Sequence, residues 1–236
     1  MSTELVASNR APGLFVVPEA LIPDDAEIAP HVTIYAGVEL GSGVSIGQGA
    51  ILGRPRQVHG RSRSRPRAEN EVTAIGDGCR IGSHTVVVAG ARIGAAAYLA
   101  DQVSVREGST VGAEAMIGRL CSIGNDVRVG DRTRIFNATI LAPWTVIDED
   151  VLMSPRVTCL SDPTMGRTAA DARLPAVVVR RACRIGTGAI LVPPVEIGEE
   201  AVVGAAAMVR DDVPARTVVA GSPARHLRDV REDELL

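Results

Sequence analysis

An apolar residue, mostly a branched aliphatic one, returns at every sixth position from Ile75 to Cys159. A second ladder of small or β-branched residues stands four positions after each step, and glycine often follows the aliphatic residue directly. An amphipathic helix needs apolar residues at i, i+3, i+4 and i+7, and an ordinary strand alternates with a period of two. A period of six fits neither pattern over this length. It predicts short parallel strands that are joined by tight corners and wound into a solenoid.

The composition supports a narrow, stacked interior. Among 236 residues, 46% are hydrophobic but only 2% are aromatic, whereas a globular core usually buries large rings. The 24 glycines suit repeated tight corners. The repeat covers most of the chain, so we expect one elongated domain: a lead-in over 1–27, a solenoid over 28–210 with loops at 53–72 and 160–178, and a tail over 211–236 that contains a short helix.

Charge and cysteine usage exclude several classes of protein. The net charge of −3 gives no basic field for nucleic acid. The chain has no run of about 18 apolar residues and no basic-then-apolar start, so we expect a cytoplasmic protein without a membrane partner. All four cysteines fall on the two ladders, which predicts buried thiols. Because no C-x-x-C pair occurs, neither a disulfide nor a metal site is expected.

The loop at 53–72 is rich in arginine. It contains Arg54, Arg56, Arg61, Arg63, Arg65 and Arg67, together with His59. The loop is either a solvated excursion or an arm that attracts the phosphate of a nucleotide or coenzyme. The sequence leaves both interpretations open.

Three C-terminal motifs carry a family resemblance. The run IGEEAVVGA at 197–205, DVP at 212–214 and GSPAR at 221–225 resemble the hexapeptide-repeat acyltransferases. This resemblance implies a left-handed parallel β-helix with three hexads per coil, a homotrimer with sites between subunits, and acetyl-CoA or another acyl-CoA as cosubstrate.

Two further motifs resemble the branch of this family that acts on amino groups. They are VREG at 105–108 and SDPTMGR at 161–167, and the branch includes nucleotide-linked amino-sugar N-acyltransferases. The chain departs from that branch at Ser161, where asparagine is frequent, and at Pro194, where glycine is usual. Another branch of the family acts on hydroxyl groups and uses a catalytic histidine in a middle coil. This chain has no histidine at an equivalent position.

With three hexads in each coil, residues 18 positions apart stack on the same corner. One corner then carries Asp101, Arg119 and Asn137 with His84 alongside, and another carries Glu107 and Asn125. Corner residues are expected to point outward and to be exposed. Such a stack is either ordinary surface polarity or a groove that binds a ligand.

Acyl transfer from a thioester to an amine needs a positioned amine, a group that accepts its proton, and a donor for the oxyanion. The candidate bases are Glu107, His84 and Asp162. Each also has a simpler interpretation: a salt bridge with a neighbouring arginine, an exposed corner histidine, and an Asp-Pro turn. The candidates for binding the acceptor are Asp101, Arg106, Arg119, Asn137 and Arg167.

The resemblance places acyl-CoA along the C-terminal coils. Small residues there let the pantetheine arm approach the backbone, and arginines can bind the phosphates. The candidates are Gly186, Gly204 and Ala205 for the arm, and Arg180, Arg181, Arg210, Arg216 and Arg225 for the phosphates. Each arginine taken alone is equally well a solvated charge.

The leading interpretation is a CoA-dependent N-acetyltransferase that acts on a small amine, such as a nucleotide-linked amino sugar. The alternatives are an acyltransferase for an amino acid or diacid amine, and a trimeric scaffold without activity. A solenoid carbonic anhydrase is disfavoured, because it needs three histidine ligands for zinc and the four histidines here are scattered.

Overall fold

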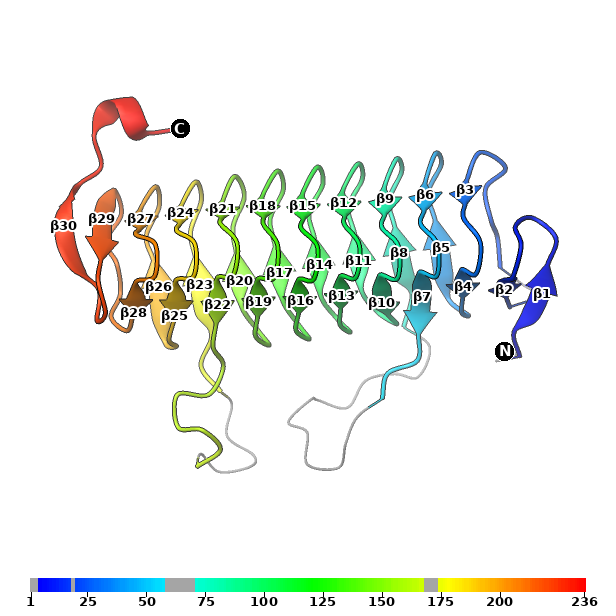
Figure 1. Ribbon diagram of the computed structural model, residues 1–236, viewed down its shortest axis with the longest axis horizontal. Helices are drawn as coiled ribbons and strands as arrows, with labels where there is room; N and C mark the ends of the chain where they lie inside the picture. Colours follow the sequence, from blue (N-terminus) through cyan, green and yellow to red (C-terminus); the bar gives the residue numbers. More distant parts are fainter. Residues whose placement is uncertain (1–3, 18–19, 58–70, 168–173) are drawn as a thin grey trace.

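The computed structural model describes residues 4–17, 20–57, 71–167 and 174–236. They form a β-solenoid with three long faces, and each face is one sheet (Figure 1). Sheet A contains β1 (Val6–Ser8), β2 (Leu14–Val16), β4 (Thr33–Ile34), β7 (Ile51–Arg54), β10 (Val86–Val88), β13 (Ser104–Val105), β16 (Ser122–Ile123), β19 (Ile140–Leu141), β22 (Thr158–Cys159), β25 (Ile190–Leu191) and β28 (Met208–Val209).

The other two sheets have the same construction. Sheet B contains β3 (Glu27–Ile28), β6 (Ser45–Ile46), β9 (Arg80–Ile81), β12 (Tyr98–Leu99), β15 (Met116–Ile117), β18 (Arg134–Ile135), β21 (Leu152–Met153), β24 (Arg184–Ile185), β27 (Val202–Val203), β29 (Thr217–Ala220) and β30 (Arg225–Asp229). Sheet C contains β5 (Val38–Leu40), β8 (Thr73–Ile75), β11 (Arg92–Ile93), β14 (Thr110–Val111), β17 (Arg128–Val129), β20 (Val146–Ile147), β23 (Val177–Val179) and β26 (Val195–Ile197).

The register of the strands confirms the period of the sequence. In sheet A, Val87 pairs with Val105, and Val105 pairs with Ile123, so successive coils are 18 residues apart. The pairing is parallel throughout the coils. Glycine after the aliphatic residue is required where coils turn closely above one another: a Cβ on Gly82 would lie 2.4 Å from the carbonyl carbon of Ala100. Three hexads therefore make one coil, as the family resemblance implies.

The two ladders of the sequence form the core. The aliphatic ladder is buried, with Leu99, Ile117 and Ile135 fully enclosed, and all four cysteines are buried and free. The small second ladder has a further role, because its hydroxyl groups reach the next coil. Thr85 Oγ1 donates to the Ala100 carbonyl oxygen at 2.7 Å, and Thr133 Oγ1 donates to that of Asp148 at 2.8 Å. Buried carbonyl groups at the corners are thereby satisfied.

The ends of the solenoid differ from the expected ones. In the lead-in, β1 and β2 form an antiparallel pair, and β2 stacks in parallel on β4, so this segment extends sheet A beyond the first coil. The predicted C-terminal helix is wrong for most of its length. Residues 225–229 form β30, which pairs antiparallel with β29, and only Glu232–Glu234 form a single 3₁₀ turn, η1. The strand covers the last edge of sheet B, which would otherwise offer unpaired backbone groups. No helix in the described part of the chain is long and apolar enough to cross a membrane.

Both insertions leave the solenoid at one corner. We name the corners by the sheets that they join: the A–C, C–B and B–A corners. The first insertion follows β7 and the second follows β22, and Figure 1 shows the chain leaving on the same side after each strand. Only β10, β13, β16 and β19 lie between them in sheet A. At the usual strand spacing, the two departure points are about 24 Å apart.

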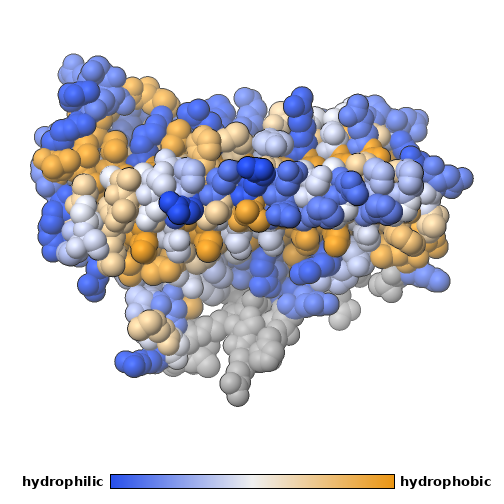
Figure 2. Space-filling view, viewed as in Figure 1, coloured by the Kyte–Doolittle hydropathy of each residue, from blue (hydrophilic) through white to orange (hydrophobic). Residues whose placement is uncertain are grey.

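The outer face of sheet A carries one charged residue, Arg54, which is exposed at the last position of β7. Its other outward positions from β2 to β28 are Phe15, Thr33, Ile51, Val86, Ser104, Ser122, Ile140, Thr158, Ile190 and Met208. Phe15 and Ile140 are 46% and 47% exposed. Figure 2 shows hydrophobic residues in a row over sheet A, beneath a hydrophilic row.

Candidate functional site

The part of the A–C corner between the two insertions differs chemically from the other corners. It consists of residues 88–90, 106–108, 124–126 and 142–144, and we call it the interloop edge. Corner side chains are expected to be exposed, yet Glu107 is 1% and Asn125 is 4% exposed. The prediction of exposure is wrong for both residues.

Glu107 is held by its neighbour in the chain. Arg106 Nε donates to Glu107 Oε2 at 3.0 Å, and Arg106 Nη2 donates to Glu107 Oε1 at 2.9 Å. The Arg106 side chain is 38% exposed, so the pair has one buried and one accessible partner. Bidentate pairing fixes the plane of the carboxylate. The salt bridge predicted as the simpler interpretation of Glu107 is present, and it orients a buried carboxylate at this edge.

Asn125 and Trp144 follow on the next two coils. Asn125 Nδ2 donates to Asp126 Oδ2 at 2.9 Å. Trp144 Nε1 is buried and has no acceptor among the residues that the structure describes, which ordinarily costs about 1–3 kcal/mol. The sequence singled out Asn125 only as the residue that stacks with Glu107, and it did not single out Trp144. The signal available was their place, since both share the corner that carries Glu107 and both insertions.

The candidates on the B–A corner are occupied by the scaffold. Asp101 Oδ1 accepts the backbone N–H of Ser83 at 2.9 Å, and Asn137 Oδ1 accepts that of Arg119 at 3.0 Å. Each oxygen therefore satisfies a backbone donor on the preceding coil. The side chains of Arg119 and His84 are exposed on the same corner. Within one chain, sheet A separates this group from Glu107, so the structure does not bring the predicted bases together.

Asp162 opens the second insertion and organises its turn. Its Oδ1 accepts from the Thr164 N–H at 2.9 Å, and its Oδ2 accepts from the Gly166 N–H at 2.8 Å. This is the geometry of the turn that the Asp-Pro pair suggested. Arg167 is exposed in the same segment. In the first insertion, His59 and the arginines at 61, 63, 65 and 67 lie outside the described residues, whereas Arg54 and Arg56 are described.

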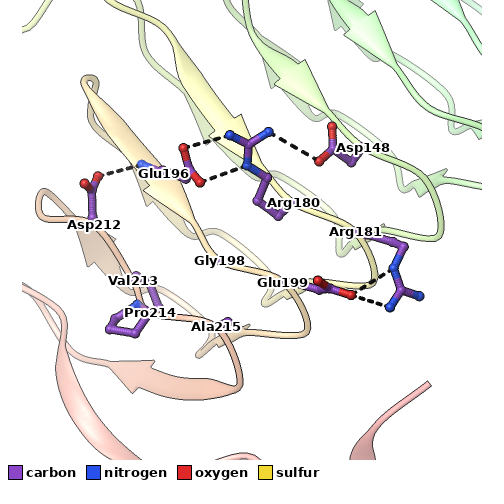
Figure 3. Close-up of a pocket in the computed structure, with 10 residues that line it drawn as sticks. All are labelled: Asp148, Arg180, Arg181, Glu196, Gly198, Glu199, Asp212, Val213, Pro214 and Ala215. Carbon is purple, nitrogen blue, oxygen red and sulfur yellow. Dashed lines mark hydrogen bonds and ion pairs between the residues drawn. The ribbon is translucent and has the colours of Figure 1, made fainter.

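Two of the expected CoA ligands line an open pocket of about 510 Å³ near the C-terminal end (Figure 3). Arg180 Nε donates to Glu196 Oε1 at 2.8 Å, and hydrogen bonding to Glu196 raises the pKa of Arg180. Arg180 Nη1 also lies 3.7 Å from Asp148 Oδ2. Arg181 Nε donates to Glu199 Oε1 at 3.0 Å. Both guanidinium groups are already neutralised by carboxylates, which weakens their suitability for phosphate.

The remaining CoA candidates are spread over the end of the solenoid. Arg210 and Arg225 meet in a second pocket of about 220 Å³ beside β30. Arg225 Nη1 lies 3.9 Å from Asp211 Oδ2, and Arg216 Nε donates to Glu200 Oε2 at 2.8 Å on the C–B corner. The small residues Gly186, Gly204 and Ala205 lie on the B–A corner. The structure thus groups Arg210 with Arg225 and Arg180 with Arg181, while Arg216 and Arg181 both lie within electrostatic reach of Glu200.

Within the described ranges, no cluster of three histidine, cysteine, aspartate or glutamate side chains has a geometry that could hold a metal ion. The thiols are equally unsuited to be ligands or nucleophiles. Burial raises the pKa of Cys159 and of Cys183 to about 12. The polar side chains of the interloop edge are the guanidinium of Arg106, the carboxylates of Glu107 and Asp126, the amide of Asn125 and the indole N–H of Trp144.

Known proteins give the context for this arrangement. No family model matches the chain. Galactoside O-acetyltransferase of Escherichia coli is 29% identical over 117 residues, which are 47% of this chain and 58% of the relative. The bifunctional protein GlmU of Mycobacterium tuberculosis is 25% identical over 236 residues, 97% of this chain and 42% of the relative. The chain thus spans less than two thirds of these curated relatives.

Among solved structures, the UDP-N-acetylglucosamine O-acyltransferase LpxA of Moraxella catarrhalis superposes with a TM-score of 0.56. It is 19% identical and covers 92% of this chain and 76% of its own. At this identity the likeness shows the fold alone. The period of six from Ile75 to Cys159, the 18-residue coils and the sequence relatives together agree with the resemblance to the hexapeptide-repeat acyltransferases.

Proposed function

We propose that the protein is an acyl-CoA-dependent N-acyltransferase, with acetyl-CoA as the donor and a small amine, most simply an amino sugar, as the acceptor. The observation that carries this proposal is the interloop edge: a buried, oriented carboxylate lies between the only two long insertions of the described solenoid. Loops that flank a rigid scaffold commonly select the substrate. The relative named for a galactoside favours a sugar as the acceptor.

The chemistry assigned to this edge is simple. The unprotonated amine attacks the thioester carbonyl, the C–N bond forms, the C–S bond breaks, and the amine proton leaves as CoA departs as a thiol. In this proposal Glu107 accepts that proton and passes it to the departing thiolate of CoA, and Arg106 keeps the carboxylate in one orientation. Asn125 lies one coil away and offers an amide to the acceptor. The phosphates of CoA bind Arg210 and Arg225, whose guanidinium groups are the least neutralised of the candidates.

We further propose a homotrimer that is assembled through sheet A. Apart from Arg54 at the end of β7, the outer face of sheet A is uncharged from β2 to β28, which is unusual for a surface that stays in water. Apolar patches of this kind mark interaction sites. The A–C and B–A corners border this face on opposite sides. Cyclic packing through sheet A would place the B–A corner of one copy, with His84 and Arg119, near the Glu107 corner of the next.

The experiment is a screen of amines with acetyl-CoA, in which release of free thiol is measured. Amino sugars, nucleotide-linked amino sugars and amino acids are compared at equal concentration. The proposal expects turnover with an amino sugar, and preference for an amino acid would favour the alternative acceptor class. A scaffold without activity would release no thiol, and its melting temperature would not rise with millimolar acetyl-CoA. A protein that uses acetyl-CoA in this way is expected in the cytoplasm.

A further inference from the structure

The tryptophan of the interloop edge is not explained by the proposed chemistry. Trp144 is the only tryptophan in the chain, and its Nε1 is buried without an acceptor among the described residues. Buried donors are nearly always paired, because leaving one unpaired forfeits its hydrogen bonds to water. Phenylalanine would supply a similar ring without that cost. The indole N–H at this position therefore lacks a partner in the described part of the chain, and an oxygen atom of a bound molecule would satisfy it.

The position of Trp144 shows where such a partner would lie. Its backbone N–H donates to the Asn125 carbonyl oxygen at 3.1 Å, so it stacks on the coil of Asn125. Its φ of +65° is the conformation of the other corner residues at this hexad position, for example Asp126 at +58°. The second insertion begins after Leu160, one coil further on. Trp144 is thus the last residue of the interloop edge, and the second insertion leaves the same corner on the next coil.

A hydrogen bond next to Trp144 shows that the regular stacking ends there. Elsewhere the hydroxyl groups of the second ladder donate to a carbonyl 15 residues further on, as Thr85 does to Ala100 and Thr133 to Asp148. Thr145 instead donates to the Ala142 carbonyl oxygen of its own corner, at 2.7 Å. The corner of Trp144 is therefore not linked to the next coil in the usual way.

We propose that the indole N–H of Trp144 donates a hydrogen bond to an oxygen atom of the acyl acceptor and thereby selects and positions that molecule. An indole N–H is only a donor, so its partner is an acceptor oxygen, such as that of a hydroxyl, carbonyl, carboxylate or phosphate group. The same property means that Trp144 cannot accept the amine proton, and it is a positioning residue. The inference rests on the proposed function, because it names one contact of the acceptor within that site. Since Nε1 is covered while the ring is partly exposed, acceptor binding must displace the atoms that cover it.

The single indole gives a direct reporter. In a ¹H–¹⁵N spectrum the protein shows one indole cross-peak, which is titrated first with acetyl-CoA and then with the amine that gives turnover, or with UDP-glucosamine if none does. We expect the peak to move downfield on adding the amine. In kinetics, Trp144→Phe is expected to raise the KM for the amine about tenfold, the equivalent of one hydrogen bond, with kcat within about threefold. Tyr98→Phe, which removes a hydroxyl from an exposed ring on sheet B, is the control and should change neither constant.

The outcomes separate this inference from the proposed function. Turnover with an unmoved indole peak and an unchanged KM in Trp144→Phe would overturn the inference and leave the function standing. If no amine is turned over, the function fails, and the peak still decides: movement with UDP-glucosamine supports the contact, and no movement rejects it. If Trp144→Phe does not fold, the titration of the wild-type protein gives the same decision.

Discussion

Removal of Arg106 should destabilise the protein far more than its partly exposed position suggests. The Glu107 carboxylate is 1% exposed, and both of its oxygens accept from the Arg106 guanidinium. Arg106→Ala would leave this carboxylate buried without its partner, a change that costs about 3–5 kcal/mol for fully buried pairs. Because the Arg106 side chain is 38% exposed, we expect the lower end, about 3 kcal/mol.

The reverse change should cost less. Glu107→Gln keeps the shape and one acceptor oxygen, and Arg106 can turn to water, so we expect a loss of about 1 kcal/mol. The double variant Arg106→Ala/Glu107→Gln should lose about 2 kcal/mol rather than the sum of about 4 kcal/mol, because it no longer contains an unpaired buried carboxylate. The difference is a coupling energy of about 2 kcal/mol between the two residues. Urea unfolding measures these values. With a slope near 3 kcal/mol/M, Arg106→Ala should lower the midpoint by about 1 M.

Glu114→Gln provides the matched control, because Glu114 is an exposed carboxylate on the C–B corner, and it should change stability by less than about 0.5 kcal/mol. The slope must be the same in all variants for the midpoints to be compared. If Arg106→Ala were as stable as Glu114→Gln, Glu107 would not be a buried carboxylate that depends on this pair, and the interloop edge would lose its distinguishing feature.

Three further predictions concern other parts of the molecule. Burial raises the pKa of the Cys159 and Cys183 thiols to about 12, so a thiol reagent should detect no cysteine in the native protein and four after unfolding. Hydrogen bonding to Arg228 lowers the pKa of Glu234 from 4.5 to about 2. The contact between Arg228 and Glu234 is therefore fully present above about pH 4.5 and is lost as the pH falls toward 2. An acid protease should accordingly cleave the C-terminal tail faster at pH 2 than at pH 4.5. Ile140→Lys places a charge in the middle of sheet A and should convert the proposed trimer to a monomer in light scattering; an unchanged mass would reject sheet A as the interface.

The sequence predicted the interior of the protein well because the repeat acts directly on it. A side chain at the first position of each hexad must point inward, whatever its neighbours are, so Ile117 and Cys159 could be assigned to the core without a structure. The 18-residue register followed from the three hexads per coil that the family resemblance implies. The two insertions, where the period fails, leave the solenoid at the same corner. Counting hexads along the chain gives the same result, but the shared corner becomes evident only in the structure.

The side chains at the corners were less predictable, since their exposure depends on which other side chains and loops pack against them. Asp77 and Glu107 occupy the same hexad position, but Asp77 is exposed and Glu107 is buried. Asp101 looked like a ligand-binding group but serves a backbone N–H of the preceding coil. A short polar side chain that lies 18 residues after a corner backbone N–H indicates that it accepts a hydrogen bond from that N–H. The C-terminal strand was missed because the alternation in 225–229 is short and charged, and its pairing with β29 is tertiary.

The most direct test of the interloop edge as the acyl-transfer site compares two carboxylate variants in one assay. Both variants, Glu107→Gln and Glu114→Gln, are first shown to be folded. Each is then assayed without urea, with acetyl-CoA and the best amine from the screen. We predict that Glu107→Gln lowers kcat by about 10² or more, while Glu114→Gln retains wild-type turnover. Equal turnover by the two variants would contradict the assignment of Glu107 as the group that accepts the amine proton.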